Sequence, residues 1–343
     1  MNILLVRLSA IGDVVMASPL PTAIKKNHPE AKVTWLCQPE CKELLIHHPD
    51  VDQVITWRKN DWRALWKKGH LLQLNKEIRR LKNRLRAEDF DLALDLQGLL
   101  KSGYLAWLSG AEKRVSLGAS EGSHLLVHQV ISRDGGDQDL IGSEYRFFAE
   151  QLGYDTSIFE MTLGISSESF ASAQSRAQNS FGAEFFVICP FTTRPQKHWF
   201  DDYWKTTAAQ LLKQWNLPVV MLGGPADVDA AYEICRDTEI INLTGQTSLQ
   251  EAAALISQSK GLIGVDTGLT HMGHAMKVPT LALFGSTCPY LKTGLKSSKV
   301  IYLNRQCAPC RRNPTCGGTF DCLREITPKR VMDEFALLYK PAS

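Results

Sequence analysis

Four segments of the chain contain carboxylate, hydroxyl or cationic side chains, three of them together with glycine, and each segment follows an apolar run typical of a β-strand. The first segment, Ser9 to Asp13, comes after the apolar run Ile3–Val6. Asp13 stands near the start of an expected helix, so its carboxylate has two interpretations. It could take a proton from an attacking hydroxyl as a general base. Alternatively, it could cap the helix, a role that aspartate fills well.

The second segment offers a site for an anion. It reads Asp266-Thr267-Gly268-Leu269-Thr270-His271 and stands between an apolar run and a helical pattern. The first N–H groups of a helix lack partners and lie at the positive end of its dipole. Those of Thr267, Gly268 and Leu269 therefore suit a diphosphate. An ordinary capped helix is the alternative interpretation.

Two further turns follow strand patterns in the second half of the chain. In the first turn, a lysine could neutralise a leaving diphosphate while threonine hydroxyls bond its oxygens, although a solvated basic loop is the alternative. In the second turn, glycine permits close approach of a nucleotide and an aspartate could accept hydrogen bonds from a ribose. The residues concerned are Thr192, Thr193, Lys197, Gly224 and Asp227.

Length and composition limit the class of protein. The chain has 343 residues, more than one hydrophobic core usually serves, so two domains are expected. Apolar residues make up 44% and charged residues 22%, which argues against disorder. A net charge of +3 does not indicate a nucleic-acid partner. Because no apolar run reaches about 18 residues and the first strand is too short for a signal sequence, we expect a cytoplasmic protein, peripheral to a membrane.

Strand and helix patterns alternate along both halves of the chain. This alternation predicts an α/β fold with two doubly wound domains facing each other across a cleft. We expect an N-terminal domain over 1–160 and a second domain over 168–327, with a linker between them. The last helix, within 328–343, could pack back on the N-terminal domain. Residues 116–142 are expected to be mostly loop, and 280–284 to be the last strand.

Four motifs in matching order resemble those of the ADP-heptose:lipopolysaccharide heptosyltransferases, glycosyltransferase family 9. Each motif is loose by itself, but four in register over most of the chain are specific. The third motif looks more like that of heptosyltransferase I, with heptosyltransferase II as the alternative. The motifs are Ser9-x-x-Gly12-Asp13, Asp95-x-Gln97-Gly98-Leu99-x-Lys101-Ser102, Thr192-Thr193-Arg194 with Lys197-His198-Trp199, and Asp266-Thr267-Gly268-Leu269-Thr270-His271.

The resemblance implies two Rossmann-like domains in the GT-B arrangement and an inverting transfer of heptose from ADP-heptose to the Kdo-lipid A inner core of lipopolysaccharide. It implies that Asp13 is the catalytic base and that Lys197 contacts the donor phosphates. Asp227 falls where the family often has a glutamate for the ribose. The remaining donor-binding positions are Asp266, Thr267, Gly268 and His271.

The resemblance also implies the partners. The N-terminal domain would bind an anionic lipid-linked saccharide at the inner face of the inner membrane, and the C-terminal domain would bind the nucleotide sugar. No obligatory metal or other cofactor is expected, because the lysine and the helix amides would stabilise the departing ADP. Nucleic acid is not an expected partner.

Cationic and aromatic side chains are densest in residues 57–68, where the resemblance places acceptor contacts. Arginine and lysine there could pair with carboxylates and phosphates, and tryptophan suits a membrane interface. A surface helix with inward-packed aromatic residues is the alternative, and residues 76–86 are expected to form an amphipathic helix with a solvated basic face. Relatives often have an arginine around 120–124, where this chain has none. The positions assigned to the acceptor are Ser9, Gly12, Arg58, Lys59 and Arg63.

Nine cysteines are present, and four of them cluster near the C-terminus. Thiolates at short spacing could bind zinc, but the spacing is not that of paired zinc knuckles. A disulfide or a set of reduced thiols fits as well. The four are Cys307, Cys310, Cys316 and Cys322.

Two other classes of function share the expected architecture. A nucleotide-sugar epimerase would need no lipid acceptor, and a non-catalytic binding protein would hold the nucleotide sugar without releasing ADP. A dehydrogenase is a more distant alternative, because the first post-strand loop lacks the G-x-G-x-x-G fingerprint.

Overall fold

The computed structural model describes residues 1–311 and 313–341 and divides into two compact units. The change of unit at 164/165 falls in the region where a linker was expected. The short segment Asp139–Ile141 belongs to the second unit, where the Ile141 N–H donates to the Lys292 carbonyl. No sequence pattern indicates that this segment joins the second unit. The first unit comprises Met1–Gln138 and Gly142–Gly164, and the second comprises Asp139–Ile141 and Ile165–Ser343.

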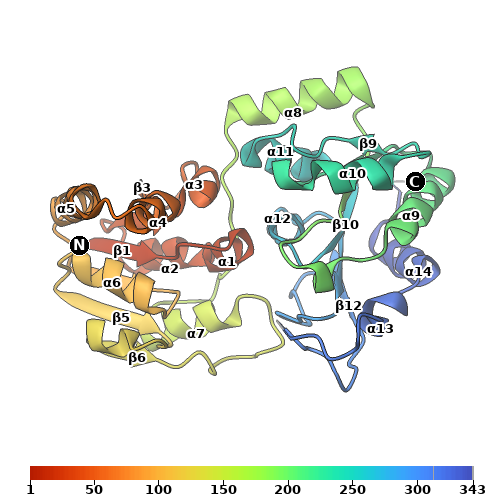
Figure 1. Cartoon of the computed structure of the whole chain (residues 1–343). Helices are drawn as coiled ribbons and strands as arrows, with labels where there is room; N and C mark the ends of the chain where they lie inside the picture. Colours follow the sequence, from red (N-terminus) through yellow and green to blue (C-terminus); the bar gives the residue numbers. More distant parts are fainter. Residues whose placement is uncertain (312, 342–343) are drawn as a thin grey trace. The chain divides into compact units, whose positions relative to one another are not determined.

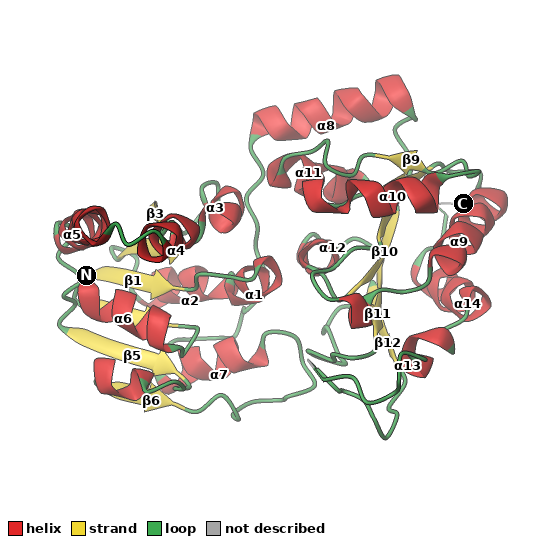
Figure 2. Ribbon diagram, viewed as in Figure 1, coloured by secondary structure: helices red, strands yellow, loops and turns green. Residues whose placement is uncertain are grey.

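A parallel sheet of six strands forms the centre of the first unit, in the order β3-β2-β1-β4-β5-β6. Figure 2 shows β1, β5 and β6 of this sheet in yellow. This is a doubly wound order, and its direction reverses between β1 and β4. Apolar side chains on successive residues of β1 are buried, as expected for a sheet covered on both faces. The strands are β1 (Asn2–Val6), β2 (Lys32–Cys37), β3 (Gln53–Thr56), β4 (Leu92–Asp95), β5 (Lys113–Leu117) and β6 (Gln129–Ile131).

The helices of the first unit cover this sheet. Leu85 and Leu105, from α5 and α6, share a buried core with Leu4 and Val6 of β1. The helix that was expected to start near Asp13 ends at Ala17, because Pro19 begins a new helix. The helices are α1 (Ile11–Ala17), α2 (Pro19–Asn27), α3 (Pro39–Leu45), α4 (Lys59–Lys67), α5 (Leu71–Arg86), α6 (Leu100–Leu108) and α7 (Ser143–Gln151), with a 3₁₀ turn at Ser123–Leu126.

The second unit repeats the same winding. Its six parallel strands have the order β12-β11-β10-β7-β8-β9, so the direction reverses between β7 and β10. The expected α/β fold with two Rossmann-like doubly wound units is confirmed. The strands are β7 (Phe186–Cys189), β8 (Val219–Met221), β9 (Ile241–Asn242), β10 (Gly261–Val265), β11 (Thr280–Phe284) and β12 (Ser298–Tyr302).

Helices also cover the second sheet, and α8 lies alongside α11 (Figure 1). The expectation that the final helix returns to the N-terminal domain is wrong for the described residues. Phe335 of α14 is fully buried in the core of the second unit, with its ring 5.8 Å from that of Trp215. Residues 342–343 lie outside the described residues. The helices are α8 (Ser167–Ser180), α9 (Asp201–Trp215), α10 (Val228–Cys235), α11 (Leu249–Gln258), α12 (Gly268–Ala275), α13 (Asp321–Arg324) and α14 (Pro328–Leu338), with 3₁₀ turns at Pro195–Lys197 and Pro225–Asp227.

Three strands are missing from the sequence-based prediction. The region 116–142 was expected to be mostly loop, yet it contains the end of β5 and all of β6. β6 has only three residues, two of them exposed, so it lacks a buried apolar run. β12 follows the strand that was expected to be last, and as an edge strand it buries only Ile301 fully.

Among the described helices, none is both long and apolar enough to cross a bilayer.

Candidate active site

Asp266, directly after β10, is the centre of a hydrogen-bonded network in the second unit. The Lys197 Nζ lies 2.5 Å from one carboxylate oxygen, and the His271 Nε2 lies 3.3 Å from the other. The Thr287 hydroxyl also donates to the carboxylate, and the Thr192 hydroxyl donates to the Asp266 carbonyl at 3.1 Å. The structure therefore brings four of the predicted donor-binding residues together: Thr192, Lys197, Asp266 and His271.

The charge state of Asp266 follows from these partners. Burial acts to raise the pKa of its carboxyl. The hydrogen bond from His271 and the charges of His271 and Lys197 outweigh burial and hold the pKa well below its ordinary value. An ionised carboxylate at this position fixes the direction of the Lys197 ammonium, whose side chain is only 15% exposed.

The start of α12 adjoins this network. Thr267 has extended backbone geometry and precedes the first helical residue, Gly268. The first amides of a helix have no intrahelical acceptor, so the N–H groups of Thr267, Gly268 and Leu269 are available to an anion. Thr267 caps nothing with its own side chain, which leaves its hydroxyl free for a ligand.

The network lies at the reversal point of the second sheet. Thr192 and Lys197 follow β7, Asp266 follows β10, and these two strands are neighbours. Ligands of open parallel sheets bind beyond the carboxyl ends of the strands at this point. Thr193 is exposed and has no hydrogen bond to the network among the described residues, so its predicted contact with the donor remains a prediction.

The turn after β8 stands at the same edge of the sheet. Its Asp227 carboxylate accepts a hydrogen bond of 2.8 Å from the Gly224 N–H, so it closes its own turn. Gly223 could not carry a side chain, because a Cβ atom there would lie 2.6 Å from the Phe191 ring. No hydrogen bond among the described residues links Asp227 to Asp266, and its contact with a ribose remains a prediction.

Sequence reasoning missed two members of the network. Thr287 follows β11, so the rule that functional residues follow strands could have found it. Tyr290 lies further along the same loop and is buried, with its hydroxyl 2.7 Å from the His271 Nδ1. The His271 ring therefore contacts Asp266 through Nε2 and the Tyr290 hydroxyl through Nδ1. Tyr290 thereby fixes the orientation of the imidazole, and no sequence pattern indicated it.

In the first unit, Asp13 lies in the first turn of α1 and makes two contacts with the loop that precedes this helix. Its Oδ2 accepts a hydrogen bond of 2.9 Å from the Ala10 N–H, which is the capping contact expected from its position. The same oxygen lies 2.7 Å from the Arg7 Nη2. Arg7 lies between the first strand and the Ser9–Asp13 segment and was not singled out, and it is almost completely buried. Capping is thus present, and one carboxylate oxygen makes neither contact.

The Arg7–Asp13 pair lies at the reversal point of the first sheet. The Arg7 Nη1 donates to the Leu96 carbonyl at 2.9 Å, and the Leu8 N–H donates to the Gln97 Oε1 at 3.2 Å. These bonds connect the loop after β1 to the loop after β4, and the direction of winding changes between these two strands. Asp13 therefore stands at the ligand-binding edge of its own sheet.

The structure places only some of the predicted acceptor residues near Asp13. Ser9 lies in the loop before α1, and Gly12 precedes Asp13 in the first turn of that helix. Burial is the main cause that lowers the pKa of Lys101. Repulsion from the charges of Lys59 and Arg7 lowers it further. Lys101 was in a quoted motif but was not named as a site residue, and it lies in the first turn of α6, which follows β4.

Two predicted acceptor residues remain at the surface of α4. Arg58 lies 3.7 Å from Asp61 in an exposed ion pair, and Arg63 is exposed further along the helix. Neither contacts the Arg7–Asp13 pair among the described residues. Their role in binding an acceptor remains a prediction.

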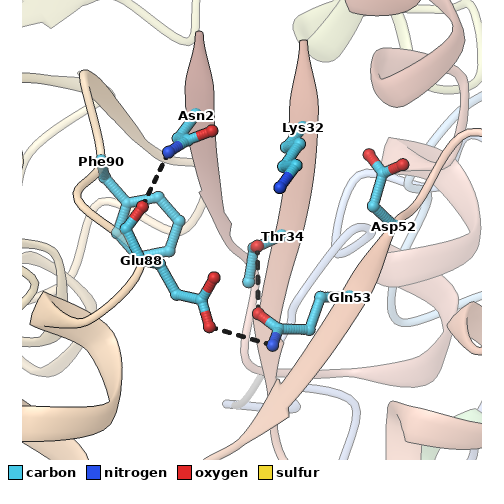
Figure 3. Close-up of a pocket in the computed structure, with 7 residues that line it drawn as sticks. All are labelled: Asn2, Lys32, Thr34, Asp52, Gln53, Glu88 and Phe90. Atoms are coloured by element: carbon cyan, nitrogen blue, oxygen red, sulfur yellow. Dashed lines mark hydrogen bonds between the residues drawn. The ribbon is translucent and has the colours of Figure 1, made fainter. Parts of the chain in front are cut away.

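A pocket of about 280 Å³ opens elsewhere in the first unit (Figure 3). It lies at the amino ends of β1, β2 and β3, the edge opposite the loops described above. Its polar groups already bond one another, for example Thr34 with Gln53, and Gln53 with Glu88. None of the predicted site residues lines it, and the amino edge of a parallel sheet is not where such folds bind their ligands. Its lining residues are Asn2, Lys32, Thr34, Asp52, Gln53, Glu88 and Phe90.

The cysteines have the form of free thiols. In the part of the chain that the structure describes, no group of three or more His, Cys, Asp or Glu side chains has the geometry of a metal site. Burial raises the pKa of the Cys322 thiol to about 11, whereas N–H groups of Phe320 and Gly318 lower the pKa of Cys316. Cys316 and Cys322 therefore differ in their surroundings, although charge on Cys307, Cys310 and Cys316 also contributes to raising the pKa of Cys322.

Known proteins resemble this chain over its whole length. It is 30% identical to lipopolysaccharide heptosyltransferase 1 of Pseudomonas aeruginosa, across 99% of each chain. It is 26% identical to lipopolysaccharide heptosyltransferase 2 of Escherichia coli, across 98% of each. The crystal structure of a family 9 glycosyl transferase from Veillonella parvula has the same fold, with a TM-score of 0.83 at 20% identity over 98% of this chain and 97% of that one.

Residues 78–319 match the family described as glycosyltransferase family 9 (heptosyltransferase). This match covers more than half of the chain, and it includes the motif segments that follow β4, β7 and β10. The chain belongs to glycosyltransferase family 9, the heptosyltransferases, and is a glycosyltransferase.

Proposed function

We propose that this glycosyltransferase moves heptose from ADP-heptose onto the Kdo-lipid A inner core of lipopolysaccharide, with inversion at the anomeric carbon, as heptosyltransferase I does. The observation that carries the proposal is the placement of reactive groups at both reversal points. The first unit holds the Arg7–Asp13 pair there, and the second holds Lys197 and Asp266 beside an open helix start. The 30% identity to a heptosyltransferase 1 favours that acceptor.

The proposed reaction uses these groups in sequence. The Asp13 carboxylate takes the proton from an acceptor hydroxyl, whose oxygen attacks the anomeric carbon from the face opposite the diphosphate. The bond between that carbon and the ADP oxygen breaks, and ADP leaves with the electron pair. Lys197 and the amides of Thr267 and Gly268 stabilise the negative charge that develops on the leaving phosphate.

Asp266 has an indirect part in this scheme. As a buried carboxylate it would repel a diphosphate, so we assign it the positioning of Lys197 and His271 rather than direct contact with phosphate. Thr192 and Thr193 would donate hydroxyl groups to phosphate oxygens. Gly224 and Asp227 would lie beside the adenosine.

The remaining assignments follow from the same scheme. We assign acceptor binding to residues 1–160 and donor binding to residues 168–327. Ser9, Gly12, Arg58, Lys59 and Arg63 would contact the acceptor, and Lys101 is added to them because it lies near Lys59. The stabilising donors are protein groups, so no obligatory metal or cofactor is proposed. Because the acceptor is anionic and lipid-linked, we propose that the enzyme is located peripherally at the inner face of the inner membrane.

A single assay tests the proposal against its alternatives. ADP release is measured with ADP-heptose and, in parallel, with Kdo-lipid A, with mono-heptosylated Kdo-lipid A, or with no acceptor. Release that depends on the unmodified acceptor supports heptosyltransferase I activity. Preference for the mono-heptosylated acceptor would assign the chain to heptosyltransferase II, to whose E. coli form it is 26% identical. Isomerised donor without acceptor would indicate an epimerase, and tight donor binding without any release a binding protein.

A further inference from the structure

The region from Arg58 to Arg86, which contains α4 and α5, concentrates the positive charge of the chain. It contains eleven Lys and Arg residues and two Asp and Glu residues, a net charge of +9. The whole chain carries +3, so the other 314 residues together carry −6. Most of these cations are on exposed residues, and among the described residues Lys67, Lys68 and Lys76 form no ion pair. The charge is therefore available to an anionic partner.

Apolar side chains are exposed at the turn between the two helices. The exposed fractions are 67% for Trp66, 55% for Leu71 and 88% for Leu72. A single exposed leucine is ordinary on a protein surface, but three large apolar residues within seven positions at one turn are not. Lys67 and Lys68 stand between them in the sequence. We call residues 66–72 the α4–α5 tip.

Other residues fix the two helices to the sheet, so the tip is not needed for packing. Trp62 packs edge-on against the buried Trp57 ring, with ring centroids 5.6 Å apart. Leu81 and Leu85 of α5 are buried in the core of the unit. None of the residues of α4 is buried, and α5 buries only these two. Both helices are therefore anchored at one side while the tip residues make no contribution to the core.

We propose that the α4–α5 tip inserts its apolar side chains into the interface of a bilayer that contains anionic lipid, while the surrounding lysines and arginines contact the headgroups. Apolar residues next to a strongly basic face are the pattern of a segment that lies in a membrane interface. A tryptophan ring favours the boundary between headgroups and acyl chains. Each cation near an anionic surface strengthens binding by about fivefold.

A nucleic acid would use the cations but would leave Leu71 and Leu72 in water, so the charge and the apolar tip together favour lipid. The inference deepens the proposed function, because it rests on a lipid-linked acceptor for its biological purpose. It does not depend on that acceptor for its physical basis, since the tip can bind a vesicle in which no substrate is present. The two proposals can therefore fail separately.

The experiment measures co-sedimentation of the full chain with vesicles, in the absence of donor and acceptor. One set of vesicles is pure phosphatidylcholine, and the other contains one fifth phosphatidylglycerol. We expect binding to the anionic vesicles that weakens as salt is added. One variant removes the apolar side chains of the tip and another removes its charges. The two variants are Trp66→Ser with Leu71→Ser and Leu72→Ser, and Lys67→Gln with Lys68→Gln.

Both variants should lose at least tenfold in affinity for the anionic vesicles, and only the charge variant should become less sensitive to salt. Matched controls change equally exposed residues elsewhere and should bind like the unchanged chain. All changed side chains are exposed, so folding is retained, and circular dichroism verifies it. The controls are Leu125→Ser with Leu337→Ser, and Lys213→Gln with Lys296→Gln.

Several outcomes would overturn the proposal. Vesicle binding that is absent, or that the tip variants leave unchanged, would refute it. The proposal would also be refuted if a duplex DNA fully displaced the unchanged chain from the vesicles and the apolar variant still bound that DNA equally well. Turnover with a lipid-free acceptor fragment should be the same in all variants, and a loss there would assign the tip to the catalytic machinery instead. Vesicle binding without any transfer activity would leave the docking surface intact and reject the proposed function alone.

Discussion

The Arg7 Nη2 lies 2.7 Å from the Asp13 Oδ2, and the same guanidinium donates through Nη1 to the Leu96 carbonyl at 2.9 Å. One buried side chain thus connects the candidate base to the loop after β4. Because Arg7 is held at both ends, it fixes the position of the Asp13 carboxylate relative to the sheet. A side chain that only capped α1 would not need such a partner.

Replacing Asp13 with Asn should reduce kcat about 100- to 10,000-fold, because the amide keeps the shape of the side chain but cannot take a proton. The affinity for ADP should stay the same, since the proposed phosphate contacts belong to the second unit. Steady-state ADP release and calorimetric titration with ADP provide the two readouts. Asp61→Asn, at an exposed carboxylate of the same unit, is the control. Full turnover in the Asp13 variant would leave capping as the sole role of this residue.

Replacing Lys197 with Met should weaken ADP binding about 10- to 100-fold, the effect expected when a hydrogen bond between charged groups is lost. It should also destabilise the second unit by about 3 kcal/mol, because the buried Asp266 carboxylate loses its cation. Adding Asp266→Asn removes the unpaired charge. The double variant should regain stability without regaining ADP affinity, and urea denaturation with ADP titration separates the two effects. If ADP affinity returned along with stability, the role of Lys197 would be structural.

Replacing Phe335 with Ala should destabilise the second unit by about 3–5 kcal/mol, because the ring is fully buried and lies 5.5 Å from that of Phe186. Hydrogen exchange should accelerate in β7 and β11 and remain unchanged in β1. Leu337→Ala on the same helix is the control, since its side chain is 67% exposed and should matter little. Faster exchange in the first unit instead would contradict the placement of α14.

The sequence predicted the central strands well, because their pattern is local. Runs such as those of β1 and β10 are apolar on successive residues, and the polar turns that follow them stand out. The edge strand β6 could not be found in this way, because a short strand with two exposed residues differs little from a loop. The break between α1 and α2 has a local signal, because Pro19 favours the first position of a helix.

The candidate site was predictable where the chemistry lies directly after a strand. Asp266 and Lys197 were named from their turns, and the fold brings them within 2.5 Å. Tyr290 could not be found, because it reaches His271 only through the path of the loop after β11. The position of Arg7 was visible, but its contact with Asp13 depends on a loop conformation that residue types do not specify.

His274 lies one turn after His271 on α12. We expect its burial to make the stability of the second unit depend on pH. It is fully buried, and neither of its ring nitrogens has a hydrogen-bond partner among the described residues. Burial, with repulsion from His271 added, lowers its pKa to about 3 from an ordinary value of 6.5. The aromatic ring that packs against it belongs to Tyr290.

Because the folded state resists protonation of His274, the unfolded chain binds more protons between pH 6.5 and pH 3. The contribution to stability is complete above pH 6.5 and is lost as the pH falls through this range. Lowering the pH to about 5 should cost the second unit about 2 kcal/mol. Asp266 acts in the same direction, but only below its ordinary value of 3.8, outside this window.

The variant His274→Met replaces the imidazole with an apolar side chain that adapts to the space. Its second unit should lose about 2 kcal/mol less stability between pH 7 and pH 5 than the unchanged chain, measured by hydrogen exchange in β10 and β11. The first unit contains His48, whose pKa burial also lowers, so its own pH dependence serves as an internal control that the substitution should not alter. Identical pH profiles for the second unit in both proteins would show that His274 does not titrate on unfolding, and its burial would then have no part in acid sensitivity.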